Sequence, residues 1–451
     1  MKFVVKSKKV LTGGALKKAS VLIENGKIAD VFEYEKKTNW MTDDFGELVL
    51  MPGLTDTHVH INEPGRTDWE GFETATKAAV AGGITLLVDM PLNSSPVTTT
   101  SDSLDLKIQS AENKLYADTG FYGGLIPGNT DQLELLIKKG VLGLKAFMID
   151  SGIDEFPFVN EKDLRKAMSS AALRNAPELP LLVHAETECG VVKPDKYSPN
   201  SFKSFLTTRP AEWEHKAVKI LIKLCREFRH HIHIVHLSSA GSLEMIREAK
   251  REGLPLTVET CPHYLYFSSE EIPDNDTRFK CTPPIRDSIN REKLWEAVSD
   301  GTIDFIVSDH SPCDTGLKYM PEANFEKAWG GIAGLQFSLP VFWTAAKERG
   351  ISIEKVSELM SRRTAEFLGI GNKKGKIETG FDADIVVFDP DKKFTVEDKN
   401  IFHRHKTTPY SGRDLFGVTE TVYLRGMKVF DKGKIVSAAA GEIVLNNKFI
   451  N

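Results

Sequence analysis

The chain has 451 residues, of which 41% are hydrophobic and 27% are charged. These are ordinary values for a soluble globular protein, and they exclude a fibrous or intrinsically disordered chain. The 58 basic and 63 acidic residues give a formal net charge of -5, which provides no electrostatic footprint for nucleic acid and no polybasic membrane anchor.

The five cysteines lack the paired spacing of a disulfide framework, and no apolar run is long enough to span a membrane. Lysines interrupt the N-terminus too early for the core of a signal peptide. We therefore expect a cytoplasmic enzyme with a small-molecule substrate, and neither a nucleic acid nor a membrane as partner.

The two ends of the chain are expected to form short strands. Val21–Phe32 holds two apolar runs around Asn25-Gly26, which is a hairpin signal. Near the C-terminus, Asp382–Pro390 predicts a buried strand, and Thr421–Val436 predicts two more around Asp431–Gly433. Neither end has enough strands for a stable sheet alone, so we predict that together they build one small β-sandwich domain.

Eight short apolar runs lie between these ends, and most of the stretches between them have the 3.6-residue period of amphipathic helices. The runs are Leu54–His60, Ile84–Met90, Asp118–Leu125, Leu142–Met148, Pro180–Ala185, His231–Leu237, Leu256–Cys261 and Ile303–Asp309. Eight parallel strands with crossover helices predict an α/β fold, a (β/α)8 TIM-type barrel. We expect the barrel to span residues 52–373, with residues 1–51 and 374–451 forming the sandwich.

Barrel enzymes carry their catalytic groups at the carboxyl ends of the strands, and several of the eight runs end in polar side chains. The first run ends with His58 and His60, which share one face of a strand. Lys145 lies inside the fourth run, and His184, His236 and Asp309 end the fifth, sixth and eighth. The alternation of strand residues places His236 on the face of Ile232 and Ile234, with His231 and His233 on the other.

Each of these residues alone has an ordinary explanation. A His-x-His pair occurs by chance, Lys145 could extend to the barrel rim, and a single histidine could be a core residue. Asp309 could be a helix N-cap. Coincidence at five strand ends is much less probable than one common site. Imidazole and carboxylate suit zinc or a similar divalent ion, and the set is too large for one tetrahedral zinc, which predicts two metals.

Three phrases of the sequence resemble one family closely. They are DTHVHINEPGRTDWEGFETATKAAVAGG (Asp56–Gly83), DMPLNSSP (Asp89–Pro96) and SDHSPC (Ser308–Cys313). They resemble the amidohydrolase superfamily in its cyclic-amidase branch of hydantoinases, dihydropyrimidinases, dihydroorotases and allantoinases, and within that branch the allantoinases most. The resemblance covers essentially the whole chain.

The resemblance implies a set of site residues. His58, His60 and Asp309 would bind one divalent metal ion, and His184 and His236 would bind the other. Lys145, carboxylated by carbon dioxide, would bridge the two ions. Zinc is the favoured metal, with cobalt or manganese as alternatives. Asp309 would also act as the catalytic base, taking a proton from the attacking water and passing it to the departing ring nitrogen. The family further suggests a homo-oligomer, a tetramer.

Two positions bear on the substrate that the resemblance implies. Dihydroorotases typically carry an arginine two residues after the second histidine of the pair, where this chain has Asn62. Hydantoinases usually have a tyrosine five residues after the metal lysine, where this chain has Asp150. We expect hydrolysis of allantoin to allantoate, with a dihydropyrimidinase or hydantoinase as the alternative. A dihydroorotase or a non-catalytic assembly protein of this branch ranks lower.

Five residues are predicted to contact the substrate. Cys281 and Thr282 lie in a stretch, CTPPIRD, that resembles the family segment whose backbone binds the cyclic amide. Gly330 and Gly331 belong to WGGIAG, where glycines let the backbone approach a ligand, although an ordinary loop before a helix explains them equally well. Asn93 could line the pocket or form a turn.

Overall fold

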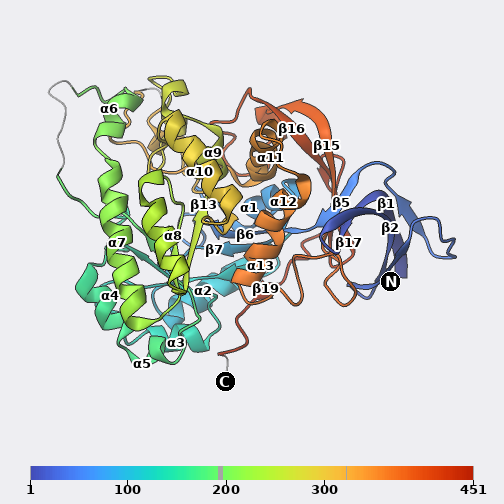
Figure 1. Cartoon of the computed structure of the whole chain (residues 1–451), viewed down its shortest axis with the longest axis horizontal. Coiled ribbons are helices and arrows are strands. Elements are labelled where there is room, and N and C mark those ends of the chain that lie inside the picture. The colour runs from blue at the N-terminus through green and yellow to red at the C-terminus, as the bar shows by residue number, and fades with distance from the viewer. Residues whose placement is uncertain (1, 191–196, 321, 450–451) are drawn as a thin grey trace.

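The computed structural model describes residues 2–190, 197–320 and 322–449. It consists of a helix-covered barrel and a β-sheet beside it that carries the N-terminus (Figure 1). Within the described ranges, no helix combines the length and the apolar character that a membrane crossing requires.

The barrel strands occupy all eight predicted runs. They are β6 (Leu54–Val59), β7 (Ile84–Asp89), β8 (Asp118–Phe121), β9 (Gly123–Gly124), β10 (Leu144–Phe147), β11 (Leu181–His184), β12 (Ile232–Ile234), β13 (Leu256–Thr260) and β14 (Phe305–Ile306). β8 and β9 are two halves of one strand interrupted at Tyr122: β8 pairs with β7, and β9 pairs with β10.

All barrel pairs are parallel. The circle closes where Val59 of β6 pairs with His310, just after β14. There the backbone N–H of His60 donates to the carbonyl of His310 at 2.8 Å. The predicted fold class, a (β/α)8 barrel with a small β-domain built from both termini, is confirmed, and the strands expected to form a β-sandwich are paired in one nine-stranded sheet.

Helices follow the strands and cover the barrel (Figure 1). They are α1 (Phe72–Ala81), α2 (Ser101–Ala111), α3 (Leu133–Lys138), α4 (Glu161–Met168), α5 (Ala171–Arg174), α6 (Phe202–Thr207), α7 (Ala211–Phe228), α8 (Leu243–Arg251), α9 (Pro262–Tyr266), α10 (Ser288–Asp300), α11 (Ser338–Glu348), α12 (Ile353–Ser357) and α13 (Arg363–Phe367).

Short helical turns complete the set: η1 (Ala240–Ser242), η2 (Ser269–Glu271), η3 (Thr277–Phe279), η4 (Thr315–Lys318), η5 (Leu335–Phe337), η6 (Glu358–Arg362) and η7 (Asp398–Asn400). α4 and α5 share the crossover between β10 and β11. The Ser170 hydroxyl accepts from the N–H of Leu173 and so starts α5 as a separate helix.

The two ends of the chain meet in one nine-stranded sheet. Its strands are β1 (Lys2–Thr12), β2 (Ala15–Glu24), β3 (Lys27–Glu33), β4 (Thr42–Asp44), β5 (Val49–Pro52), β15 (Ile385–Thr395), β16 (Asp414–Leu424), β17 (Met427–Asp431) and β18 (Lys434–Ile435). β5 joins the two halves, because it pairs with β1 on one side and with β15 on the other. The exact division of the chain at residues 51 and 373 stays a prediction.

One short C-terminal strand leaves this sheet. β19 (Ile443–Val444) pairs with β8, next to the amino ends of the barrel strands. The sequence pattern did not predict this strand, because two residues carry no periodic signal.

The alternation of barrel residues decides which side chains face the interior. In β10, Leu144 and Ala146 pack in the apolar layer shared with the helices. Lys145 lies between them, so its side chain points into the barrel. By the same alternation His233, between Ile232 and Ile234, also points into the barrel interior. The fold thus brings polar groups from distant strands to one interior.

Candidate metal centre

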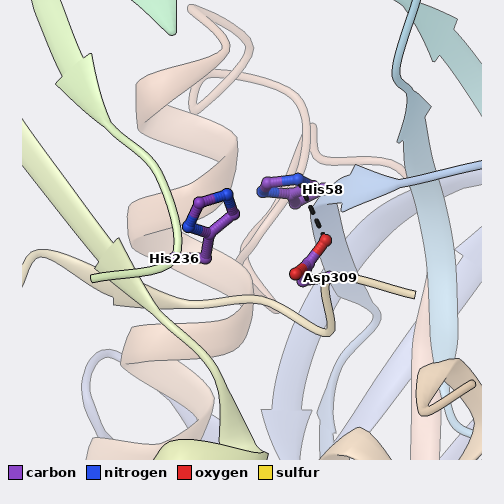
Figure 2. A group of neighbouring side chains, drawn as sticks. All are labelled: His58, His236 and Asp309. Carbon is purple, nitrogen blue, oxygen red and sulfur yellow. Dashed lines mark ion pairs between the residues drawn. The ribbon is translucent and has the colours of Figure 1, made fainter. Parts of the chain in front are cut away.

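Three predicted ligands lie close together at the mouth of the barrel. His58 is on β6, His236 follows β12, and Asp309 follows β14 (Figure 2). One ligand atom of each lies within 4.8 Å of the other two, and all three residues are buried. Nε2 of His58 is 3.2 Å from Oδ1 of Asp309. Such a spacing is suited to a single divalent ion held between them.

The other two predicted histidines join the same cluster. Nε2 of His60 is 3.7 Å from Oδ1 of Asp309. The His184 ring lies edge-on to the His236 ring at 4.6 Å, and the His58 ring is 5.3 Å from that of His236. Burial lowers the pKa of all four imidazoles below the usual value. Each ring is therefore neutral, which is the form that binds metal.

Lys145 is fully buried, and within the described residues its Nζ has no hydrogen-bond partner. The Nζ of Lys145 lies over the ring of Phe147, 5.0 Å from the ring centroid. Phe147 in turn stacks on His184 at 4.7 Å. Burial lowers the pKa of Lys145 and raises that of Asp309. A buried amine with no acceptor is costly, and neutralising it by reaction with carbon dioxide would remove that cost.

The backbone corrects one expectation about the sixth strand. The alternation predicted that His236 would face the side of Ile232 and Ile234, away from His233. The strand ends at Ile234, and His236 has a φ of 38°, in the left-handed region. This turn redirects the His236 side chain to the interior, where it meets His184 and His58. Asp309 is turned in the same way, with a φ of 46°.

Buried hydrogen-bond acceptors orient three of the predicted histidine ligands. Two of these acceptors are carboxylates that were not predicted from the sequence. Glu259 on β13 hydrogen-bonds Nδ1 of His58 and, at 2.9 Å, Nε2 of His233. Glu186 lies 2.7 Å from Nε2 of His184. For His60 the acceptor is the carbonyl of Leu92, 2.8 Å from Nδ1. Such partners fix the tautomer and the direction of a ligating imidazole.

A second group of donors shares Asp309. Cys261, His263 and Asp309 also have ligand atoms within 4.8 Å of one another. Burial lowers the pKa of His263 to about 3, and neither of its ring nitrogens has a partner within the described residues. Burial raises the pKa of the Cys261 thiol well above its usual value, so this sulfur lacks the thiolate form that metals bind. The histidine-rich group is therefore the better metal site.

The predicted substrate residues lie on loops that come after β7, β13 and β14 in the chain. The Thr282 side chain packs against Gly330: a β-carbon added there would lie 3.1 Å from Cγ2 of Thr282. At Gly331 an added β-carbon would meet the carbonyl oxygen of Ser311 at 2.3 Å, so that position requires glycine. Burial raises the pKa of the Cys281 thiol to about 12. Any contact of Cys281 with a ligand is thus made by a neutral group or by the backbone.

Asn93 lies on the loop that supports His60. Its side-chain amide donates to Oδ1 of Asn62 at 3.3 Å, and Asn62 donates to the carbonyl of Pro312 at 3.2 Å. Both asparagines are buried. The position where dihydroorotases carry an arginine is therefore filled by a neutral residue with a partner inside the protein.

The donor set fits a pair of divalent ions. Four imidazoles, a carboxylate and a buried lysine whose Nζ has no acceptor among the described residues converge on one interior, where the positive charge of Lys145 opposes the rise in the pKa of Asp309. The group contains only nitrogen and oxygen donors, which suits zinc and other first-row divalent metals.

Comparison with known proteins agrees with this geometry. Residues 49–436 match the amidohydrolase family, and the chain belongs to that family. Among its relatives, the allantoinase of Arabidopsis thaliana is 46% identical, over 98% of this chain and 90% of that protein. The allantoinase of Saccharomyces cerevisiae is 38% identical, over 98% and 99%. The predicted family and the hydrolase class are thus confirmed.

Solved structures give the same fold. An L-hydantoinase (dihydropyrimidinase) from Arthrobacter aurescens superposes with a TM-score of 0.90 at 27% identity, covering 99% of this chain and 100% of that one. The structural neighbour is thus more distant in sequence than the allantoinases.

Proposed function

We propose that this protein hydrolyses the cyclic amide bond of allantoin to give allantoate. The observation that carries the proposal is the convergence of His58, His60, His184, His236, Lys145 and Asp309 at the barrel mouth. The full-length similarity to allantoinases supports this substrate over those of the other cyclic amidases.

The metal centre that we propose holds two divalent ions, with zinc favoured over cobalt or manganese. His58, His60 and Asp309 would bind one ion, His184 and His236 the other, and a carboxylated Lys145 would bridge them. Bound there, the ions would supply a Lewis acid for the amide carbonyl and a nucleophile from water at neutral pH. The buried Nζ of Lys145, which has no acceptor among the described residues, supports the carboxylation.

Asp309 is the proton carrier of the proposed reaction. Its carboxylate accepts the proton of the attacking water and delivers it to the ring nitrogen that leaves. Oδ1 already lies within 3.7 Å of both His58 and His60, so the same side chain is positioned at the reacting centre. Glu259 and Glu186 hold His58 and His184 in place and take no proton in the reaction.

The ring-binding wall is proposed to consist of Asn93, Cys281, Thr282, Gly330 and Gly331. Asn62 supports an uncharged substrate at the position where dihydroorotases recognise a carboxylate, because no arginine is present to pair with one. Asp150 is exposed and offers no aromatic wall. These features favour allantoin over dihydroorotate and over an apolar 5-substituted hydantoin.

A panel of substrates tests this proposal. Purified protein loaded with zinc would be assayed against allantoin, hydantoin, dihydrouracil and dihydroorotate, with kcat/KM as the measure. We expect allantoin to be preferred by at least about 100-fold, because a site built to hydrogen-bond specific polar groups can reject an analogue that lacks them by about 10⁴- to 10⁵-fold. A preference for any other amide would overturn the assignment. Absence of turnover together with absence of bound metal would favour a non-catalytic assembly protein.

We further propose that the protein works in the cytoplasm as a homo-oligomer, a tetramer, without nucleic-acid or membrane partners. The charge balance and the cysteine pattern support the compartment. Sedimentation of the purified protein measures the mass of the assembly, and a monomer at micromolar concentration would contradict the tetramer.

A further inference from the structure

Lys318, at the end of η4, is a buried lysine that binds only backbone carbonyls. Its Nζ donates to the carbonyl of Lys280 at 3.2 Å, to that of Trp329 at 3.0 Å, and to that of Gly331. Within the described ranges of the chain, it makes no ion pair with a carboxylate. An ammonium group has three donors, and here each has an acceptor, so the side chain is fully used as a three-way tether.

The three carbonyls come from the two segments that the proposed function assigns to substrate binding. Lys280 precedes Cys281 and Thr282, whereas Trp329 and Gly331 flank Gly330. Lys318 therefore ties the CTPP segment to the glycine-rich loop. The loop also runs beside Asp309: Ile332 pairs with His310, and its carbonyl accepts from the N–H of Ser311 at 3.0 Å.

Because Lys318 binds these carbonyls, it also fixes the direction of the backbone N–H groups that follow them. In a trans peptide the carbonyl and the following N–H point to opposite sides. With the carbonyls of Lys280 and Trp329 turned to Lys318, the N–H groups of Cys281 and Gly330 point away from it. Neither N–H has an acceptor among the described residues. Two free donors thus lie on adjacent segments, which Thr282 and Gly330 hold in contact.

A neighbouring lysine provides a contrast. Lys280 is also buried, and its Nζ donates to the carbonyls of Glu326 and Ala328, at 3.1 and 2.5 Å. The N–H groups that follow those carbonyls are already used. That of Lys327 donates to Asn324 and that of Trp329 to the carbonyl of Leu317. Lys280 therefore fixes the loop without presenting a free donor.

We propose that Lys318 is a positioning residue for substrate, whose ammonium group aims the backbone N–H groups of Cys281 and Gly330 at acceptor atoms of the substrate ring other than the carbonyl that reacts. This inference rests on the proposed function. It identifies Lys318 as the residue that orients part of the proposed ring-binding wall. The charge also polarises the two peptide units, and a polarised peptide is a stronger donor. Hydrogen bonds to ring atoms that do not react stabilise substrate and transition state equally, so their loss raises KM more than it lowers kcat.

The experiment compares Lys318→Met with Lys280→Met. Methionine keeps most of the apolar stem and removes the ammonium group in both variants. Metal content, thermal midpoint, and kcat and KM for allantoin are measured on the metal-loaded proteins. For Lys318→Met we expect KM to rise at least about tenfold, as two hydrogen bonds of about 1 kcal/mol each predict, with kcat per bound metal within about threefold. Lys280→Met should lose comparable thermal stability while its KM stays within about threefold.

Lys318→Gln serves as the second variant if Lys318→Met fails to fold. It keeps a neutral donor amide, and its KM should fall between those of wild type and Lys318→Met. Equal KM values for Lys318→Met and Lys280→Met, or a loss that follows metal content alone, would overturn the positioning role.

The two proposals fail separately. If wild type prefers hydantoin or dihydrouracil, the substrate proposal fails, and the same KM comparison on that amide still decides the role of Lys318. If wild type turns over no cyclic amide, calorimetric binding of hydantoin to the metal-loaded protein replaces KM, and no binding would overturn both.

Discussion

The proposed mechanism gives the Asp309 carboxylate two roles, ligand to a metal ion and carrier of a proton, and a single substitution separates them. In Asp309→Asn the amide oxygen remains a possible ligand, but the side chain can no longer accept a proton. We expect most of the bound metal to remain and kcat to fall by about 10²- to 10⁴-fold, the usual contribution of a general base. Metal counting on the same sample as the rate measurement checks this.

A matched control lies five residues further along the chain. The Asp314 carboxylate accepts from the N–H of Gly316 at 2.7 Å, and an asparagine would keep that acceptor. Asp314→Asn should therefore have nearly the wild-type rate. An Asp309→Asn variant that turns over substrate as fast as this control would remove the general base from the mechanism.

Single residues revealed much of the site because polar groups in apolar runs are rare. Lys145 in β10 gives this signal, and Glu259, between Val258 and Thr260 in β13, gives the same signal although it is not among the predicted site residues. The direction of the His236 side chain could not be predicted. It depends on a left-handed backbone conformation at His236, and nothing in the sequence indicates that conformation for a histidine.

At the scale of elements, the eight strands of the barrel were predictable from apolar runs, and their ends were not. β14 keeps only Phe305–Ile306 of its predicted run, because the residues after it turn to place Asp309. The interruption at Tyr122 reflects pairing with two different neighbours, β7 and β10, which periodicity does not contain. The break between α4 and α5 is set by the local cap at Ser170.

The glycine-rich loop offers a test of an element as a whole. Gly331→Ala would place a β-carbon 2.3 Å from the carbonyl oxygen of Ser311, so the loop backbone must shift. A displacement approaching 1 Å can cost about 10²-fold in rate, and we expect a loss of kcat/KM of about that size with the metal retained. In the same loop, Gly334→Ala meets nothing closer than 3.5 Å and should stay within about threefold. Similar kinetics for the two alanine variants would mean that this loop is an ordinary connection.

At the scale of the whole molecule, the joining of both termini in one sheet was predictable from a count of strands: neither end could form a stable sheet alone. The number of predicted strands does not indicate how that sheet is attached to the barrel. A buried ion cluster and β19 link β8 of the barrel to the C-terminal part of the chain, and both bring together residues hundreds of positions apart in sequence. Apolar residues of the sheet and of the barrel also pack in one core.

Lys374 is the centre of that ion cluster. Its Nζ is 2.8 Å from Asp118 of β8 and 3.3 Å from Asp382, and it also pairs with Asp384, beside the start of β15. Lys374→Met would remove the cation that these carboxylates share. Asp118 would keep Arg425 and Asp382 would keep Lys27, so the buried Asp384 would be left without a cation, at a cost of about 3–5 kcal/mol. We expect a clearly lower urea midpoint for unfolding and faster exchange of the backbone amide hydrogens in both β8 and β15.

The matched comparison is Lys393→Met, which breaks an exposed pair with Asp414 and should cost less than about 1 kcal/mol. The double variant Lys374→Met/Asp384→Asn should regain part of the loss, because it removes the charge that Lys374→Met leaves unpaired. If Lys374→Met unfolded at the same urea concentration as Lys393→Met, the cluster would not be what joins sheet and barrel. The attachment of the sheet to the barrel would then depend on the apolar contacts between them.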